Sequence, residues 1–351
     1  MAQVYKNWCN YLQRCAQGGL QLRGKVDEPQ TNAEAGTEPM SRSNYRPHFE
    51  WQLRTRKLAL GQPTLLMAII NLTPDSFSGD GLLSAGGTAG RLPHATITKL
   101  AVATAIEAID AGADIVDLGA ESTRPNATPI STEQEQARLL PVLEQLLRER
   151  PRAVVSVDTY HADTARAAAR AGAEIINDVS GLTWDPSMAK AVSHSGCGLV
   201  LMHARGRSGE WQTQAGLDGD AVMPVVFAGL CEQLAEAEAA GIRTERIVVD
   251  PGFGFGKRGA ENFALLARLG RLRELGRPLL VGLSRKGFLG EAVKSLQDGK
   301  AEPAEARRIA TAAANVAAIL AGAHVLRVHD LQVAQEAAAV ADAVLSAASQ
   351  D

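Results

Sequence analysis

Cysteine is scarce in this sequence, and neither sign of charge is in large excess. The 351 residues include four cysteines, Cys9, Cys15, Cys197 and Cys231, whose spacing matches neither a disulfide framework nor a metal-binding motif. We therefore expect a chain that works in the reducing cytoplasm. The formal net charge of −3 provides no broad basic surface, so nucleic acid is not an expected partner.

The sequence also predicts no export or membrane segment. Residues 1–15 contain no apolar core of the kind that a signal peptide needs. Residues 309–326 carry no Asp, Glu, Lys or Arg, but they include Thr311, Asn315 and Gly322. This pattern predicts a buried helix followed by a strand rather than a bilayer span, and no membrane partner is expected.

Two parts of the chain differ in composition. Residues 1–45 are rich in Gln, Asn, Gly and Glu without periodicity, which predicts a poorly ordered N-terminal extension. The sequence reveals no role for this extension and does not decide between Met1 and Met40 as the start. Residues 46–351 are expected to form one catalytic domain, in which residues 47–60 form a strand or hairpin that covers the bottom of the fold.

A weak repeat organises the regular part of the chain. Three Ala-Gly-Ala triplets, centred on Gly112, Gly172 and Gly322, each follow an Ala-rich helical stretch and precede an apolar run. Glycine is favoured where a helix closes, and continuous Val, Ile and Leu runs are typical of buried parallel strands. The predicted strands are Leu65–Leu72, Asp114–Gly119, Ala153–Asp158, Glu174–Asp178, Gly198–His203, Arg246–Asp250, Pro278–Leu283 and Val325–His329.

Eight strands that alternate with helices predict a TIM (β/α)₈ barrel, which typically needs ~250 residues. A doubly wound open sheet is the structural alternative, but the first strand is not followed by Gly-x-Gly-x-x-Gly. The carboxyl ends of barrel strands share one face, where active sites lie. Polar residues at nearly all of these ends therefore predict an enzyme.

The strand-end residues fall into two chemical groups. The first group contains donors, cations and oxygen ligands suited to a polyanion with a hard metal ion: Asn71, Thr123, Arg124, Arg327 and His329. The second group combines acceptors with one cation and suits a flat heterocycle with a guanidine-like edge: Asp158, Asn177, Asp250 and Lys286. The residues thus suggest a phosphorylated, nitrogen-rich heterocycle as substrate.

Several segments resemble the signature blocks of the dihydropteroate synthase family, in the family's order. The most specific are the Thr-Pro-Asp-Ser-Phe loop that ends at Phe77 and the Ser-Arg-Lys block that ends at Lys286. The other matching segments are Glu121–Pro125, Ser156–Thr159, Asn177-Asp178, Asp250–Lys257 and Arg327–Asp330. The resemblance spans about residues 64–347.

This resemblance implies a transferase of folate biosynthesis that condenses 6-hydroxymethyl-7,8-dihydropterin diphosphate with 4-aminobenzoate and is a target of sulfonamides. It also implies Mg²⁺ at Asn71 and a homodimer. The implied catalytic residues are Asp250, Lys286, Arg327 and His329. The implied pterin site is Asp158, Asn177, Met202, Asp250, Phe255, Gly282, Lys286 and Arg327. The implied diphosphate site is Thr123, Arg124, Arg327 and His329. The implied aminobenzoate site is Phe77, Thr123, Pro125, Lys286 and Gly287.

The departures from the family pattern lie in the loops. Asn126 stands where the family usually has Gly, Gly287 stands where some members have Ser, and Leu82–Pro93 lengthens the first loop. These differences leave sulfonamide sensitivity open. Two other functions also remain as alternatives: a pterin-binding methyltransferase barrel, which would not need the diphosphate residues, and a non-catalytic pterin-binding relative.

Overall fold

A computed structural model of the chain describes residues 46–73, 93–122, 129–211, 213–296 and 303–348. Eight parallel strands close into a barrel in the order β10-β3-β4-β5-β6-β7-β8-β9, which confirms the predicted fold. The barrel strands are β3 (Leu65–Asn71), β4 (Ile115–Gly119), β5 (Val155–Asp158), β6 (Ile175–Asp178), β7 (Gly198–Met202), β8 (Ile247–Asp250), β9 (Leu279–Val281) and β10 (Ala323–Val328).

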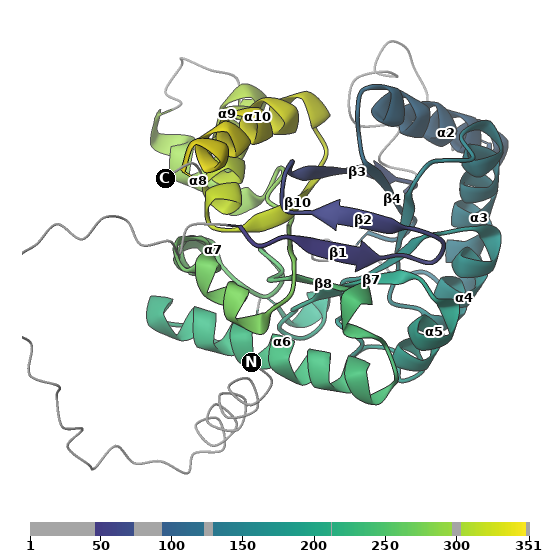
Figure 1. The fold of residues 1–351 in the computed structure, drawn as a ribbon, viewed down its shortest axis with the longest axis horizontal. Helices are drawn as coiled ribbons and strands as arrows, with labels where there is room; N and C mark the ends of the chain where they lie inside the picture. Colours follow the sequence, from purple (N-terminus) through teal and green to yellow (C-terminus); the bar gives the residue numbers. More distant parts are fainter. Residues whose placement is uncertain (1–45, 74–92, 123–128, 212, 297–302, 349–351) are drawn as a thin grey trace, which may run out of the picture.

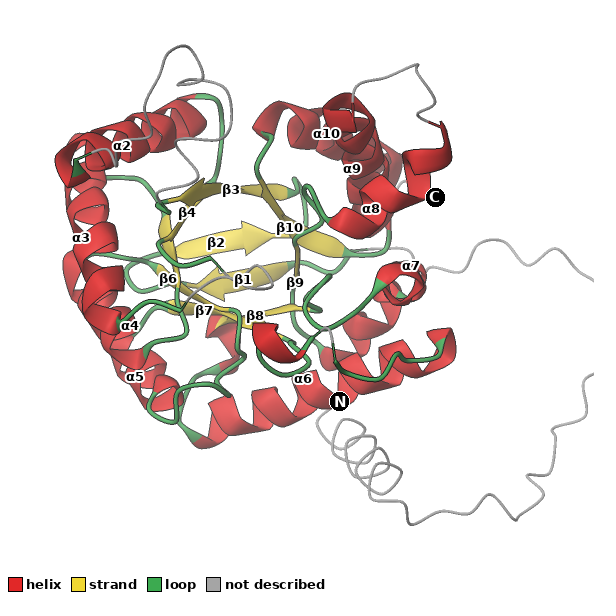
Figure 2. Cartoon of the chain, turned by 180° about the vertical axis from the view of Figure 1, so that it is seen from behind, coloured by secondary structure: helices red, strands yellow, loops and turns green. Residues whose placement is uncertain are grey.

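Helices surround this barrel on the outside (Figure 2). The α-helices are α2 (His94–Asp110), α3 (Thr132–Glu149), α4 (Ala162–Ala171), α5 (Met188–Ser195), α6 (Gly219–Ala239), α7 (Gly259–Ala267), α8 (Gly287–Val293), α9 (Pro303–Leu320) and α10 (Leu331–Ala348). The 3₁₀ helices are η3 (Ser208–Glu210), η4 (Thr244–Arg246), η5 (Leu269–Leu275) and η6 (Lys294–Leu296). Among the described helices, none combines the length and apolarity that a membrane crossing requires.

The predicted helix ends and the apolar C-terminal stretch are both confirmed. Gly112, Gly172 and Gly322 have φ angles of 96°, 112° and 112°, in the left-handed region that glycine adopts without strain. Residues 309–326 form the end of α9 and most of β10. The prediction for residues 309–326 succeeded because Gly322 separates the helical part from the strand.

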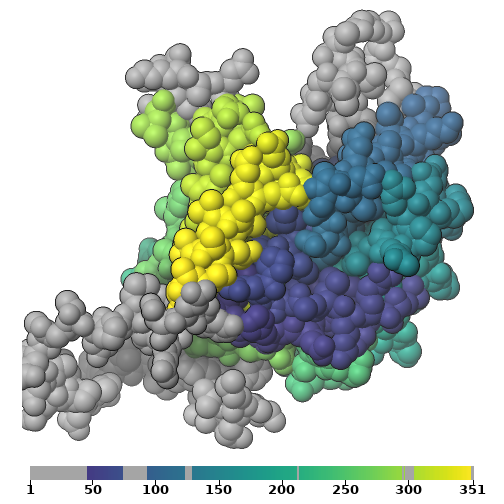
Figure 3. All heavy atoms as spheres, turned by 45° about the horizontal axis from the view of Figure 1, so that its top comes forward, coloured from purple at the N-terminus to yellow at the C-terminus, as the bar shows by residue number. Residues whose placement is uncertain are grey.

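An antiparallel hairpin of β1 (Phe49–Gln52) and β2 (Lys57–Leu60) precedes the barrel. Figure 1 shows these purple strands lying across the barrel, and in Figure 3 the purple region that includes them forms part of the surface. Trp51 is fully buried in a cluster with residues from the amino-terminal parts of the barrel strands, including Leu65 and Ile115, and its indole Nε1 donates to the Arg246 carbonyl at 2.8 Å. The prediction that residues 47–60 cover the barrel bottom is therefore confirmed.

Candidate active site

Side chains near the carboxyl ends of four strands meet inside the barrel. Arg327 donates from Nε to Asp117 Oδ2 at 2.7 Å and from Nη2 to Asp158 Oδ2 at 2.6 Å. Asn177 donates from Nδ2 to the same Asp117 oxygen at 3.0 Å. Because Asp158 and Asn177 are register partners on β5 and β6, the strand pairing itself brings them together. The structure thus places three predicted residues side by side and adds Asp117.

Burial dominates the electrostatics of this group. It raises the pKa of Asp158 to about 7, although Arg327 opposes the shift. Burial also acts to lower the pKa of Arg327, but the carboxylates of Asp117 and Asp158 outweigh it and raise that pKa overall. Strongly perturbed carboxyl groups of this kind cluster at functional sites.

A second part of the site lies at the ends of β8 and β9. Asp250 Oδ1 accepts from the backbone N–H of Gly252 at 2.7 Å. Lys286 Nζ lies 4.3 Å from the centroid of the Phe255 ring, a cation–π contact. Burial raises the pKa of Asp250, and burial lowers the pKa of Lys286 to about 8, while Asp250 and Asp158 partly offset the latter shift. Asp158, in the first part of the site, therefore interacts electrostatically with Lys286, in the second part.

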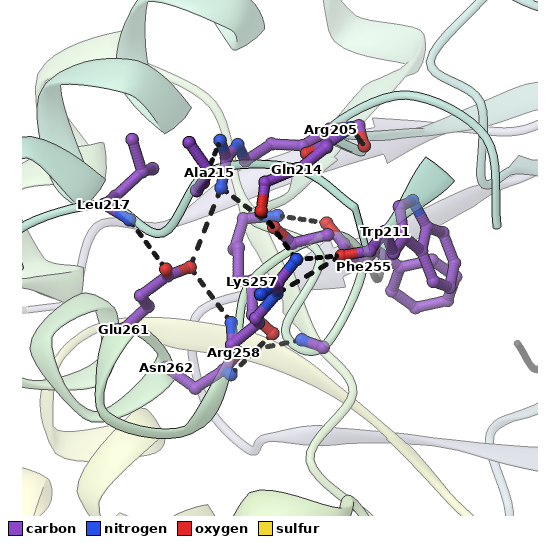
Figure 4. Close-up of polar contacts among 12 residues, drawn as sticks. Arg205, Trp211, Gln214, Ala215, Leu217, Phe255, Lys257, Arg258, Glu261 and Asn262 are labelled. Carbon is purple, nitrogen blue, oxygen red and sulfur yellow. Dashed lines mark hydrogen bonds and ion pairs between the residues drawn. The ribbon is translucent and has the colours of Figure 1, made fainter. Parts of the chain in front are cut away.

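The loop that carries Phe255 is fixed from beneath by Lys257. The buried Lys257 ammonium donates to the carbonyls of Gly252, His203 and Phe255 at 2.8, 3.1 and 3.2 Å. Trp211 packs edge-on against the Phe255 ring, with 5.2 Å between centroids (Figure 4). Burial lowers the pKa of Lys257 to about 7. These contacts hold the Phe255 ring in place for Lys286.

Gly252 allows this loop to approach the neighbouring strand closely. Its φ angle is 67°, and a Cβ atom at this position would lie 2.0 Å from the His203 carbonyl oxygen. His203 itself is buried, and burial lowers its pKa well below the usual range. It is therefore a neutral histidine behind the loop.

Two further residues of the predicted pterin site, Met202 and Gly282, lie at the ends of β7 and β9. Met202 ends β7 as the register partner of Asp250 and is buried. Gly282 follows β9, and a Cβ there would lie 3.9 Å from Cβ of Arg327. A Cβ at this position would therefore be in ordinary van der Waals contact with the arginine.

Asn71 and His329, predicted to bind the metal ion and the diphosphate, lie at the ends of the first and last barrel strands. Asn71 ends β3 opposite Gly119, and no hydrogen bond within the described ranges engages its side chain. His329 follows β10 and lies beside Ser284, with 3.2 Å between Nδ1 and Oγ. Gly287 begins α8. Phe77, Thr123, Arg124, Pro125 and Asn126 lie outside the described residues.

A separate group of ionisable side chains lies beside the carboxyl ends of β4 and β5. One ligand atom from each of Glu121, Glu135 and His161 lies within 4.8 Å of the others. Tyr160 donates to Glu121 at 2.7 Å, and His161 Nδ1 lies 3.1 Å from Glu135. The hydrogen bond to Glu135 raises the pKa of His161. The neighbouring carboxylate of Glu135 therefore favours the protonated form of His161.

Sequence reasoning missed Asp117 and gave no role to Lys257 or Ser284. Asp117 interrupts the apolar strand Ile-Val-Asp-Leu-Gly, and a charged residue within a buried strand is a usable signal because it requires a partner. Lys257 lies in one of the segments that resemble the family's signature blocks, but nothing in the sequence reveals the three carbonyls that surround its ammonium group. Ser284 was part of a signature block, and its contact with His329 depends on the barrel geometry.

Comparisons with known proteins agree with this geometry. Residues 67–329 match the family described as "Pterin binding enzyme". Dihydropteroate synthase of Escherichia coli (strain K12) is 40% identical over 282 residues, which cover 80% of this chain and 92% of that protein.

Two solved structures are also similar. The Xanthomonas albilineans dihydropteroate synthase with 4-aminobenzoic acid is 38% identical, with a TM-score of 0.72 over 85% of this chain and 98% of that one. The same enzyme in complex with 7,8-dihydropteroate is 35% identical, with a TM-score of 0.67 over 84% of this chain and 98% of that one. This chain therefore belongs to the dihydropteroate synthases of the pterin-binding enzyme family.

Proposed function

We propose that this chain condenses 6-hydroxymethyl-7,8-dihydropterin diphosphate with 4-aminobenzoate, which forms 7,8-dihydropteroate and releases diphosphate. The observation that carries the assignment of the ring is a set of three acceptor oxygens at the carboxyl ends of β5, β6 and β8. Across the ranges that the structure describes, no hydrogen bond engages Oδ1 of Asp158, Oδ1 of Asn177 or Oδ2 of Asp250. These acceptors suit the donor-rich, guanidine-like edge of a pterin.

Lys286 complements these acceptors with a donor. Its ammonium group lies over Phe255 and in the field of Asp250 and Asp158. In this position it would donate to the carbonyl oxygen or a ring nitrogen of the pterin. Met202, Phe255 and Gly282 would provide walls against the flat ring.

Arg327 and His329 would bind the diphosphate, together with Thr123 and Arg124. Arg327 remains cationic at any relevant pH because nearby carboxylates raise its pKa. A cation at this position stabilises the charge that develops on the departing diphosphate. The bond between the pterin methylene carbon and the diphosphate oxygen can therefore break before the amine of 4-aminobenzoate attacks that carbon. No side-chain nucleophile is required.

Asn71 fits the role of a Mg²⁺ ligand. Its carboxamide oxygen is a hard donor without a hydrogen-bond partner among the described residues. Mg²⁺ typically combines one or two protein oxygens with phosphate oxygens and water. When bound with the diphosphate, the ion would neutralise part of its charge.

The aminobenzoate would lie between Lys286 and the loops that follow the first two barrel strands in the sequence. Gly287 borders this region at the start of α8. Phe77, Thr123 and Pro125 would complete the pocket and help exclude water, which competes with the amine for the reactive carbon.

A direct assay tests the proposed reaction. Purified protein is incubated with the pterin diphosphate, 4-aminobenzoate and Mg²⁺, and both diphosphate and dihydropteroate are measured. Stoichiometric formation of the two products is expected. Absence of dihydropteroate at high enzyme concentration, combined with methyl transfer from methyltetrahydrofolate to a corrinoid protein, would favour the methyltransferase alternative.

We also propose a cytoplasmic homodimer. The spacing of the four cysteines matches no disulfide framework, which suits a reducing compartment. The adjacent helices α9 and α10 (Figure 1) expose Ile309, Val340 and Val344 by 63%, 61% and 50%. Exposed apolar side chains gathered on neighbouring helices are typical of a protein interface.

A further inference from the structure

Asp117 is a charged residue in the interior of the barrel, one layer below the strand ends. Its side chain is 0% exposed. Oδ2 accepts both the 2.7 Å hydrogen bond from Arg327 and the 3.0 Å hydrogen bond from Asn177. Oδ1 is buried without a hydrogen-bond partner in the described structure. A carboxylate that serves two site residues yet leaves an oxygen unsatisfied is poorly explained by stability alone.

The contact with Asn177 determines which end of the amide faces the pocket. A carboxamide has a donor nitrogen and an acceptor oxygen. Since the carboxylate of Asp117 can only accept, it selects the orientation in which Nδ2 points toward it. The Asn177 oxygen is then the atom left to the ligand, and it selects for a donor on the ligand edge.

The contact with Arg327 is made by the same carboxylate oxygen. Asp117 engages Nε, whereas Asp158 engages Nη2 at the far end of the guanidinium. The Nε contact therefore holds the arginine where the guanidinium joins the aliphatic part of the side chain. The Nη2 end of the guanidinium lies beside Asp158 in the site.

We propose that Asp117 is a positioning residue that fixes the donor–acceptor sense of Asn177 and anchors Arg327, and thereby makes the site selective for a heterocycle with an amino group on its guanidine-like edge. This inference rests on the proposed function for the identity of the ring. It goes further by assigning part of the ring selectivity to a residue that does not itself need to touch the ligand.

The test compares binding of two small rings to wild type and Asp117→Asn. The probes are 6-hydroxymethylpterin and 6-hydroxymethyllumazine, which has an oxygen where the pterin has its 2-amino group. An asparagine at position 117 can donate to the Asn177 oxygen, so the Asn177 amide is free to reverse. Calorimetry should show that the preference for the pterin falls about tenfold or more, as expected for a mismatched buried hydrogen bond.

Asp114→Asn is the matched control. Asp114 immediately precedes the same strand, at the opposite end of the barrel, and accepts from the Leu66 N–H at 2.8 Å. An asparagine can still accept this hydrogen bond, so ring preference should equal that of wild type. If Asp117→Asn lowers the melting temperature but leaves the pterin-to-lumazine ratio unchanged, Asp117 is merely structural and the proposal is wrong.

A reversed pair covers the case in which Asp117→Asn does not fold. In Asp117→Asn/Asn177→Asp the new amide donates to the new carboxylate, whose second oxygen again faces the ligand. This double variant should regain the pterin preference, and a double variant that binds both rings equally would overturn the proposal. Ring binding does not depend on turnover. Failure of wild type to make dihydropteroate would therefore contradict the proposed reaction, not the role of Asp117.

Discussion

Arg327 Nη2 lies 2.6 Å from Oδ2 of Asp158, so a residue proposed to bind the diphosphate is paired with a residue proposed to bind the pterin. The pair joins the two chemical halves of the site through a single guanidinium group. Because the Asp158 side chain is only 14% exposed, its charge depends on this neighbour, and Arg327 partly offsets the effect of desolvation on the Asp158 pKa. The ionisation of the site is therefore coupled to the arrangement of its charged residues.

The first prediction concerns pH. Burial raises the pKa of Asp158 to about 7 and lowers that of Lys286 to about 8. Below the first value Asp158 takes up a proton and loses its negative charge, and above the second value Lys286 loses its positive charge. We expect kcat/KM for the pterin diphosphate to fall on both sides of a narrow maximum, since this parameter reports the free enzyme.

Two variants assign the limbs of this profile. Asp158→Asn should have a lower kcat/KM than wild type, and its kcat/KM should no longer fall at acidic pH. Lys286→Arg should be slower and should lose the basic limb, because arginine stays protonated. A wild-type profile that stays flat through both values would contradict the assignment.

The second prediction concerns Asn71 and Mg²⁺. Asn71→Ala should weaken Mg²⁺-dependent binding of diphosphate about tenfold or more, as expected for loss of a metal ligand or a charged hydrogen bond. Binding of 6-hydroxymethylpterin should stay nearly the same. Both affinities are measured by calorimetry with and without Mg²⁺. Asn71→Asp retains an oxygen ligand and serves as the control, and equal loss of diphosphate and pterin binding in Asn71→Ala would make Asn71 a structural residue.

The third prediction concerns Gly287. No heavy atom lies within 4 Å of the position that a Cβ would take there, so a serine side chain fits. If the hydroxyl donates to the aminobenzoate carboxylate, Gly287→Ser should lower the KM for 4-aminobenzoate roughly twofold to tenfold, the usual effect of one hydrogen bond. Steady-state kinetics measure the change. Gly287→Ala adds the carbon without the hydroxyl, and an equal decrease in that variant would show that packing is the cause.

The fold was predictable because each barrel strand carries its own local signal. Continuous apolar runs identified all eight strands, and the polar residues at their ends indicated the face of the site. The first part of the hairpin was visible for the same reason, since Phe49, Trp51 and Leu53 alternate with charged or amide neighbours. Local patterns of this kind survive in the fold because the barrel buries each strand in a similar way.

The contacts inside the site were not predictable, because they join distant parts of the chain. Asp117 and Arg327 are 210 residues apart in sequence. They meet because β3 pairs with both β10 and β4, which closes the barrel between them. The same closure decides which carboxylate pairs with Arg327. Sequence reasoning predicted Asp158 as a pterin-binding residue but could not reveal that an arginine lies against it.

The fourth prediction concerns the proposed dimer. Val340 on α10 is 61% exposed, whereas Leu100 on α2 is 40% exposed on a different part of the barrel surface. An aspartate at position 340 would bury a charge without a partner if α9 and α10 form the interface, and such a burial is strongly unfavourable. Light scattering after size-exclusion chromatography should therefore give twice the chain mass for wild type and Leu100→Asp, and the single-chain mass for Val340→Asp. A wild-type protein that elutes with the mass of one chain would contradict the homodimer, and a dimeric Val340→Asp would place the interface elsewhere.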